Sequence, residues 1–334
     1  MKKLLAYDYK GVKHRGGVYH PKEVNLGDYI QTLAAKRFYD VFGPKKKYEE
    51  LDLIDRDSLL SAENSDFIAN GWYVLSDENH LWPDSADPLL VSIHIKNREG
   101  FPRVLEKLKD SSHKRPIGCR DLATLNFLKG EGVEAYFSSC LTTTLQREDW
   151  TDKKDEERSG VVFSDVAPEM MTYSPLISRG VFKQLKPSLK YNFLNFCYRL
   201  FNDRCDLSLY ENEDVRLVTH EMTKESTHAD RFREAEKLLK TFAEARLVIT
   251  SRIHCALPCL ALGTPVILIA TYDKYRYQGL EDFFNHIYVD EKSNRILKYK
   301  IEMKNGEVIN SEKYKPYAQE LEEVCMEYMK HKEE

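Results

Sequence analysis

The sequence lacks the cysteine pattern of a disulfide-bonded or zinc-binding protein. It contains seven cysteines, an odd number, and no two of them are spaced as Cys-x-x-Cys. Disulfide scaffolds and structural zinc sites both depend on cysteines paired at short, regular spacing. We therefore expect all seven to be free thiols in a reducing compartment, and we expect no bound metal ion.

Long apolar runs and a strong net charge are also absent. No stretch approaches the roughly 18 residues that cross a bilayer, and the apolar part of residues 1–10 is too short for a signal peptide. The formal net charge of −4 gives no general reason to expect a nucleic-acid partner. We therefore expect a cytoplasmic protein that binds no nucleic acid, in which any anion-binding function is local.

Three familiar signatures are missing as well. The sequence has no GxGxxG dinucleotide fingerprint, no Walker phosphate loop and no nucleophile elbow. Function must therefore be inferred from clusters of polar residues placed within the predicted secondary structure.

Short apolar runs alternate with segments of helical periodicity along most of the chain. The runs predict strands at residues 4–7, 67–73, 89–94, 116–121, 135–137, 161–165, 215–220, 247–249 and 265–270. The periodic segments predict helices at residues 29–42, 101–108, 122–129, 230–245 and 314–330. This alternation predicts an α/β fold in which helices cover both faces of parallel sheets.

A charged segment, residues 151–158, separates two similar α/β halves. We interpret it as a solvated linker or hinge. At 334 residues the chain is long for one core. We expect two Rossmann-like domains, 1–152 and 159–310, with a site in the cleft between them. We expect residues 311–334 to form a C-terminal helix that packs back on the first domain.

The strongest candidate site follows the predicted strand 247–249. The chain continues there as Thr-Ser-Arg-Ile-His, which places Ser251, Arg252 and His254 just past a strand end. Ligands of open α/β sheets bind at the carboxyl ends of strands. Arg252 can bind a phosphate or carboxylate through two N–H groups, and His254 can titrate near neutral pH. The alternative is an arginine that caps a helix C-terminus beside a core histidine.

Two further groups of cations follow strand ends. Lys274 and Arg276 come after the strand 265–270, and Arg120 belongs to the charged pair that ends the strand 116–121. Arg120 would supply a cation from the other half of the chain. Taken alone, its motif is explained more simply by a helix N-terminus with Asp121 as the cap and a solvated Arg120.

Weaker candidates are polar residues at other junctions of the predicted elements. Asn25 and Asp28 lie where a loop enters a helix, although Asp28 alone is explained by helix capping. His94 ends a strand, where a single histidine is more often structural. Thr142 and Thr143 belong to a hydroxyl-rich segment that could bind a sugar or cap a helix.

Residues 179–204 combine six basic residues with six aromatic ones and a single acid. Such a stretch suits an anionic membrane surface or a diphosphate. The alternative is a solvated helix face with its aromatic side chains in the core.

Four motifs together resemble the polysaccharide pyruvyl transferase family. They are Asn-Leu-Gly-Asp at 25–28, Ser-Ile-His at 92–94, Gly-Cys-Arg-Asp at 118–121, and Thr-Ser-Arg-Ile-His at 250–254 followed by Gly-Thr-Pro at 263–265. They occur in family order and span most of the chain, whereas residues 165–215 offer no motif from which a residue role can be carried over. The resemblance implies a GT-B-like arrangement of two Rossmann-like domains. It also implies transfer of pyruvate from phosphoenolpyruvate to a sugar of a capsule or exopolysaccharide, or of its lipid-linked precursor, as a cyclic ketal.

The resemblance also implies roles for the candidate residues. The donor would bind on the second domain to Arg252 and His254, with Arg120 reaching it from the first domain, and these three would be catalytic. Ser251, Lys274 and Arg276 would assist donor binding. The acceptor would lie on the first domain, contacted by Asn25, Asp28, His94, Thr142 and Thr143.

Phosphoenolpyruvate is a substrate in this interpretation, and no cofactor is implied. An acceptor on polyprenyl diphosphate would bring the enzyme to the inner face of the cytoplasmic membrane, with residues 179–204 in peripheral contact. Two alternatives stay open: a GT-B glycosyltransferase that uses a nucleotide sugar, and a non-catalytic sugar-binding protein.

Overall fold

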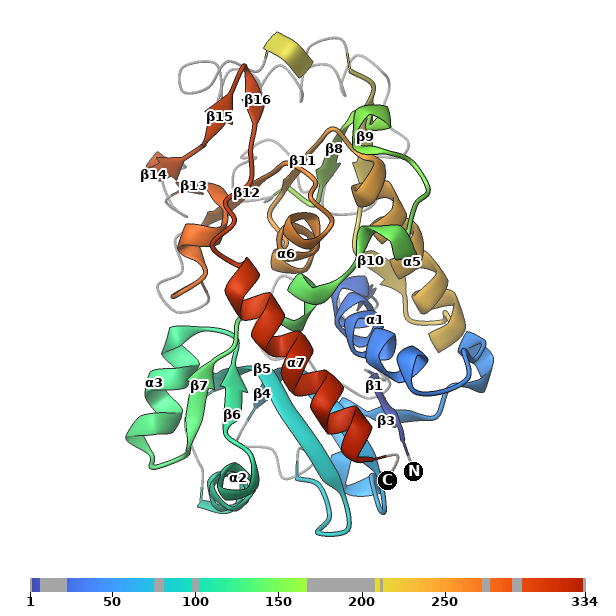
Figure 1. Cartoon of the computed structure of the whole chain (residues 1–334), viewed down its shortest axis with the longest axis vertical. Helices are drawn as coiled ribbons and strands as arrows, with labels where there is room; N and C mark the ends of the chain where they lie inside the picture. Colours follow the sequence, from blue (N-terminus) through green and yellow to red (C-terminus); the bar gives the residue numbers. More distant parts are fainter. Residues whose placement is uncertain are drawn as a thin grey trace.

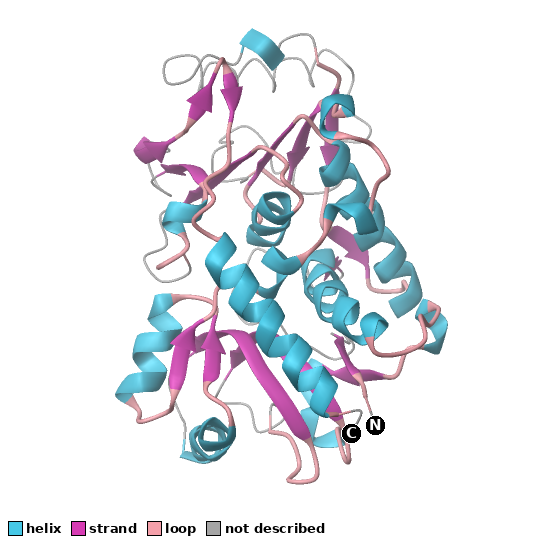
Figure 2. Cartoon of the chain, viewed as in Figure 1, coloured by secondary structure: helices cyan, strands magenta, loops and turns pink. Residues whose placement is uncertain are grey.

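The computed structural model describes residues 2–6, 23–74, 81–97, 102–166, 208–210, 213–271, 277–289 and 296–332. This part of the chain contains six α-helices and several sheets with mainly parallel strands, which confirms the predicted α/β class (Figure 2). The α-helices are α1 (Leu26–Val41), α2 (Pro102–Lys114), α3 (Leu122–Gly130), α5 (His228–Glu244), α6 (Ile253–Ala261) and α7 (Lys315–His331).

The first half of the chain builds a parallel sheet. Its strands run in the order β4 (Asp66–Val74), β5 (Asp87–Asn97), β6 (Ile117–Cys119) and β7 (Ala135–Phe137). The parallel pair β1 (Leu4–Ala6) and β3 (Leu53–Asp55) adjoins β4 through a bridge between Lys2 and Asp66. The spatial order β3-β1-β4-β5-β6-β7 therefore reverses its direction between β1 and β4, as in doubly wound sheets.

The second half builds a six-stranded sheet, in the upper part of Figure 1. Its order is β14 (Ile296–Lys300), β13 (Asn285–Val289), β12 (Val266–Thr271), β11 (Leu247–Thr250), β8 (Val161–Ser164) and β9 (Val215–Val218). Only the edge strand β14 is antiparallel to its neighbour. The chain order of the five parallel strands reverses between β8 and β11. A doubly wound sheet places its ligand at the carboxyl ends of such a strand pair.

Two short antiparallel pairs and several 3₁₀ turns complete the described structure. The pair β2 (Glu23–Asn25) and β10 (Glu221–Thr223) joins the start of α1 to the second half. The other pair is β15 (Met303–Lys304) and β16 (Glu307–Val308). The 3₁₀ turns are Tyr48–Glu50, Arg56–Ser61, Leu141–Thr144, Arg147–Asp149, Asp155–Glu157, Ser208–Tyr210 and Glu281–Phe283.

The largest hydrophobic cluster contains side chains from both halves. Ile68 and Leu89 of the first sheet belong to it, together with Phe242 of α5 and Leu257 of α6. Helix α7 crosses from the second half to the first in Figure 1 and contributes the fully buried Leu321. The two sheets are therefore joined by one continuous core.

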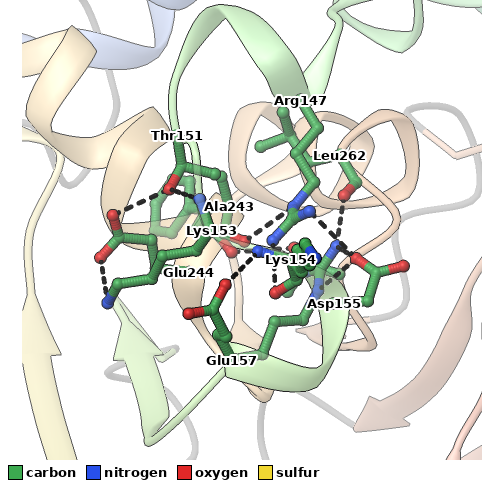
Figure 3. Close-up of polar contacts among 12 residues, drawn as sticks. Arg147, Thr151, Lys153, Lys154, Asp155, Glu157, Ala243, Glu244 and Leu262 are labelled. Atoms are coloured by element: carbon green, nitrogen blue, oxygen red, sulfur yellow. Dashed lines mark hydrogen bonds and ion pairs between the residues drawn. The ribbon is translucent and has the colours of Figure 1, made fainter.

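The charged segment 151–158 is held against α5 and the end of α6 (Figure 3). Glu244, the last residue of α5, accepts hydrogen bonds from Thr151 Oγ1 and Lys153 Nζ, each over 3.0 Å. Arg158 Nη2 donates to the carbonyl oxygen of Leu262 over 2.7 Å. The segment is thus charged, as the sequence predicts, but it is also anchored at several points.

The structure corrects the predicted start of the first long helix. Helix α1 begins at Leu26, and the side chain of Asn25 caps it by accepting a hydrogen bond from Gly27 N over 3.1 Å. The alternative in which Asp28 is the cap is therefore wrong. Asp28 instead lies buried in the first turn, where its carboxylate is 3.6 Å from the guanidinium of the buried Arg56.

Five of the seven cysteines lie in the described residues, and all five are free and buried. Cys197 and Cys205 lie outside the described residues. None of the described helices combines the length and the hydrophobicity needed to span a lipid bilayer.

Candidate functional site

Arg252 follows β11 at the point where the strand order of the second sheet reverses. Its Nε donates to Asp165 Oδ2 over 3.1 Å, and its Nη2 donates to Glu221 Oε1 over 3.0 Å. Asp165 directly follows β8, the strand beside β11, and Glu221 begins β10. The backbone is fixed as well, because Arg252 N donates to Thr250 Oγ1 over 3.0 Å. Two carboxylates from neighbouring elements therefore set the plane of the guanidinium.

Asp165 adopts a left-handed backbone conformation, with φ at 42°. Its Oδ2 also accepts the N–H of His220 over 2.8 Å, and the ring Nδ1 of His220 lies 3.3 Å away. Burial alone would raise the pKa of Asp165, but the charge of Arg252 and the hydrogen bonds from His220 lower it well below its usual range. Asp165 is therefore an ionised carboxylate at neutral pH.

His254 lies in the first turn of α6 and is 6% exposed. It packs against the start of α1, because a Cβ added to Gly27 would lie 3.1 Å from His254 Cβ and 3.2 Å from its Nδ1. Asn25, the cap of α1, is paired with Glu221 in the β2–β10 ladder. The first turns of two helices therefore meet beside Arg252, and helix N-termini favour anions.

We call this group the Arg252 cluster; it comprises Asn25, Gly27, Asp165, Glu221, Arg252 and His254. It combines a cation held by two carboxylates, a histidine and two helix N-termini. These features suit an anionic ligand with several oxygens.

A second group gathers at the carboxyl ends of β5 and β6. Asp121 caps α3 by accepting Thr124 N over 2.9 Å, which confirms the predicted cap. Its other oxygen lies 2.6 Å from Nδ1 of His94 and 3.9 Å from Nε of Arg120. Arg120 is only 2% exposed, so the alternative of a solvated arginine is wrong. We call His94, Arg120, Asp121 and Thr124 the Arg120 cluster.

Loops at the carboxyl ends of the two sheets meet next to the Arg120 cluster. Leu122 N, at the start of α3, donates to the carbonyl oxygen of Gln278 over 2.9 Å, and Gln278 lies in the loop after β12. The neighbouring Gly279 contacts Leu122 and Phe137, since a Cβ there would lie 2.7 Å from Leu122 Cγ. The carboxyl end of β6 is therefore in contact with the second half of the chain.

A family model described as polysaccharide pyruvyl transferase matches residues 25–273, about three quarters of the chain. The chain belongs to the polysaccharide pyruvyl transferase family. The resemblance carried by the four motifs is therefore confirmed, and membership indicates a pyruvyltransferase enzyme of polysaccharide biosynthesis. The matched segment begins at Asn25 and includes every residue of both clusters.

Other comparisons with this transferase are distant. No curated protein matches the chain significantly. A solved structure of an uncharacterized protein from Klebsiella pneumoniae subsp. pneumoniae NTUH-K2044 matches over 83% of this chain and 86% of that one, with 12% identity and a TM-score of 0.41.

The transferase brings Asn25, Arg252 and His254 into one group and places His94 and Arg120 in the other. Ser251 lies half-buried between β11 and α6. Lys274, Arg276 and residues 179–204 lie outside the described residues.

The two threonines expected to contact the acceptor have buried hydroxyl groups. Thr143 Oγ1 donates to the carbonyl oxygen of Cys140 over 2.7 Å, and Thr142 Oγ1 lies 3.3 Å from Cys140 Sγ. Both side chains therefore stabilise the turn after β7. Among the described residues, no group of three or more histidine, cysteine, aspartate or glutamate side chains is arranged to hold a metal ion.

Asp165 and Glu221 of the Arg252 cluster, and Arg56 beside Asp28, were not predicted from the sequence. Asp165 follows a buried strand, as Arg252 does, so its position offered a signal. Glu221 and Arg56 offered no such signal. The local sequence around a charged residue does not show which residue of opposite charge it will pair with in the folded protein.

Proposed function

We propose that this transferase moves pyruvate from phosphoenolpyruvate to a sugar of a bacterial surface polysaccharide, or of its lipid-linked precursor. The product is a cyclic pyruvate ketal, and inorganic phosphate is released. The observation that carries the proposal is the Arg252 cluster, where Arg252 and His254 lie at the strand-order reversal of the second sheet.

The charges of the cluster specify how the donor binds. Asp165 and Glu221 offset the charge of Arg252, so Arg252 alone does not neutralise a donor that carries a carboxylate and a phosphate. We therefore assign part of donor binding to the N–H groups in the first turns of α1 and α6. Arg120, from the other cluster, supplies a second cation. Ser251, Lys274 and Arg276 are further candidates for donor binding.

The chemistry needs no oxidant and balances without a cofactor. C3 of phosphoenolpyruvate gains a proton, which makes C2 electrophilic, and a sugar hydroxyl attacks C2. The bond from C2 to the phosphate oxygen then breaks with its electron pair, and a second hydroxyl closes the ketal. Two hydroxyl protons are lost overall: one balances the proton gained by C3 and the other leaves on hydrogen phosphate. We assign His254 to phosphate stabilisation or to one of these proton transfers.

We propose a GT-B-like arrangement for this chemistry, with residues 1–152 on the acceptor side and 159–310 on the donor side. Doubly wound strand order in both sheets and the contact between α3 and the loop after β12 support it. In the same proposal residues 311–334 pack back on the first domain. An acceptor on polyprenyl diphosphate would place the enzyme at the inner membrane face, with residues 179–204 in contact with lipid.

The test is to incubate the protein with phosphoenolpyruvate and candidate sugars, free or linked to polyprenyl diphosphate in vesicles. Mass spectrometry should show a gain of about 70 Da on the acceptor, the mass of one pyruvate less water, together with released phosphate. Arg252→Ala and His254→Ala should fold and lose at least about 10²-fold in turnover. The matched controls Arg233→Ala and His331→Ala, both on the surface, should keep full activity.

Three outcomes would contradict the proposal in different ways. Thermal stabilisation by a nucleoside diphosphate and not by phosphoenolpyruvate would favour a glycosyltransferase. Sugar binding without release of phosphate would favour a non-catalytic protein. Equal turnover of free and vesicle-bound acceptors would contradict only the proposed membrane contact, not the transfer of pyruvate.

A further inference from the structure

A histidine and a buried carboxylate meet where β5 ends and α3 begins. Nδ1 of His94 lies 2.6 Å from Oδ2 of Asp121. The side chain of Asp121 is fully buried, and that of His94 is 14% exposed. The pair therefore joins a shielded carboxylate to an imidazole that solvent or a substrate can reach.

The pair is held rigidly by its neighbours. Oδ1 of Asp121 accepts both the N–H and the hydroxyl of Thr124, each over 2.9 Å. Thr124 Oγ1 in turn accepts the N–H of Ile95 over 3.1 Å, and Arg120 N donates to Ile93 O over 2.9 Å. Ile93 and Ile95, on either side of His94, are thus hydrogen-bonded to the segment that contains Asp121. Such preorganisation is what a catalytic group requires.

Helix capping explains only one of the two carboxylate oxygens. The cap of α3 uses Oδ1 of Asp121, whereas Oδ2 is used by His94. Burial alone would raise the pKa of Asp121, but the hydrogen bond with His94 and the charge of Arg120 lower it below its usual value. An ionised carboxylate only accepts hydrogen bonds, so it holds the proton of a neutral His94 on Nδ1 and leaves the lone pair on Nε2.

The position of His94 in β5 shows on which face of the sheet its side chain lies. Ile93 and Ile95 are buried in the core on one face, so His94 points to the opposite face. Its partner across β4–β5 is Trp72, which packs on the largest core cluster. The face of His94 is therefore the one that the second half of the chain covers, at the same strand ends as Arg120.

The start of α1 reaches the neighbourhood of that strand end. Gly71, next to Trp72 in β4, contacts the guanidinium of Arg56, since a Cβ there would lie 3.1 Å from Nη1. Arg56 is paired with Asp28 in the first turn of α1, and that turn also contacts His254 through Gly27. Strand pairing with Trp72 and the contacts of Gly71, Arg56, Asp28 and Gly27 therefore link the Arg120 cluster to the Arg252 cluster.

We propose that His94 is the general base for an acceptor hydroxyl and that Asp121 is its positioning residue. This inference rests on the proposed function. The hydroxyl proton passes to Nε2 of His94 while the oxygen electron pair forms the bond to C2. The electron pair of the bond between C2 and the phosphate oxygen leaves with the phosphate. His94 then passes the proton to that phosphate, which departs as hydrogen phosphate.

Two amide substitutions separate this role from a structural one. His94→Asn keeps a donor near the position of Nδ1 and removes the base. Asp121→Asn keeps an oxygen for the α3 cap, and asparagine caps helices as well as aspartate does. However, it can present N–H₂ to His94, which favours the tautomer whose Nε2 carries the proton. In the serine protease triad, the corresponding change of tautomer lowers kcat by about 10⁴-fold.

Both variants should lose at least about 10²-fold in kcat while KM for phosphoenolpyruvate stays unchanged. The matched control Asp230→Asn alters a capping carboxylate at the start of α5 and should keep full activity. Thermal melting should show that all three variants fold. If Asp121→Asn does not fold, His94→Asn still decides the question.

The pH dependence of kcat/KM provides a second readout. Among the described residues, His94 contacts the charged Asp121, which is itself 3.9 Å from Arg120, and Arg56 lies beyond the neighbouring strand. In the wild-type protein, kcat/KM should fall on the acidic side of the pH profile, because the base becomes protonated there. In His94→Asn, the remaining kcat/KM should no longer show this acidic fall. If His94 were only structural, its replacement would change kcat/KM at every pH and the acidic fall would remain.

The outcomes distinguish this inference from the proposed function. If the wild-type protein neither binds phosphoenolpyruvate nor transfers pyruvate, the proposed function fails. If the wild-type protein is active and His94→Asn keeps kcat within about threefold of it, only the role of His94 is overturned. A loss confined to KM for phosphoenolpyruvate would also overturn it, because His94 would then be a donor-binding residue.

Discussion

Gly27 has a particular role in the Arg252 cluster, because its missing side chain lets α1 approach α6. A Cβ at this position would lie 3.1 Å from His254 Cβ and from Asn25 Oδ1, closer than carbon atoms normally pack. The backbone there is ordinary helix, so conformational strain does not require the glycine. The close approach of His254 favours it instead, because an added Cβ would displace His254 by a few tenths of an ångström.

Gly27→Ala should therefore fold normally but lose about 10-fold or more in kcat/KM, because His254 must move by a few tenths of an ångström. Helix propensity alone would add about 0.5–1 kcal/mol of stability, which offsets the crowding. Gly130→Ala is the matched control, since that helical glycine has no atom within 4 Å of its added Cβ. Steady-state kinetics and thermal melts check both variants. Equal kcat/KM values for Gly27→Ala and the wild-type protein would contradict the packing argument.

At the residue scale, the sequence predicts where a single side chain lies relative to a strand or helix better than it predicts which residue that side chain contacts. Arg252 was placed correctly after a strand because a short apolar run marks the end of β11. Its contact with Asp165 depends on β8 and β11 being neighbours, although they lie more than 80 residues apart. No local pattern specifies that strand order, so the ion pair could not be predicted.

At the scale of elements, the segment 151–158 shows how a charged run can be fixed in place. Glu244, at the end of α5, accepts from Thr151 and Lys153, each over 3.0 Å (Figure 3). It also pairs with Lys240 at 2.8 Å. Burial alone would raise the pKa of Glu244, but these hydrogen bonds lower it to about 2. The carboxylate form of Glu244 therefore stabilises the folded protein.

The sign of the pH dependence follows from that lowered pKa. The stabilisation should be fully present above the pKa of an unfolded glutamate, about 4.3, and should be lost as the pH falls toward 2. Glu244→Gln should therefore lower the Tm by about 2 °C at neutral pH and by less below about pH 4. Glu234→Gln, in an exposed pair with Lys237 on the same helix, should change little. If Glu244→Gln lowered the Tm as much below about pH 4 as at neutral pH, the charge of Glu244 would not be the cause.

Every element predicted from the sequence is found, whereas seven described strands (β2, β3, β10 and β13–β16) and the ends of the elements were not predicted. The nine predicted strands and five predicted helices all correspond to observed elements, because alternating apolar runs and helical periodicity are local properties. Helix α1 starts three residues earlier than predicted because Asn25 and the pairing with β10 define its first turn. That pairing joins residues almost 200 positions apart, which no local signal reveals.

At the scale of the whole molecule, the two sheets are connected by a shared core. The C-terminal helix α7 lies against β5, where Tyr328 donates its hydroxyl to the carbonyl oxygen of Asp87 over 2.5 Å. Lys332 pairs with both Asp66 and Asp87, at 2.6 and 2.7 Å. The first sheet is therefore completed by residues from the far end of the chain. The sequence predicts a C-terminal helix against the first domain, but no local pattern specifies its contacts with Asp66 and Asp87.

The shared core predicts that the two halves unfold together. All three tryptophans, at positions 72, 82 and 150, lie in the first half, so their fluorescence reports on that half, whereas far-UV circular dichroism reports on both. The two signals should give one coincident transition in urea. Leu321→Ala in α7 should destabilise the protein by about 2–5 kcal/mol and shift both signals equally, because Leu321 is fully buried in the shared core. The exposed Val41→Ala should shift neither. A fluorescence transition that separates from the circular dichroism transition would instead show two independently stable domains.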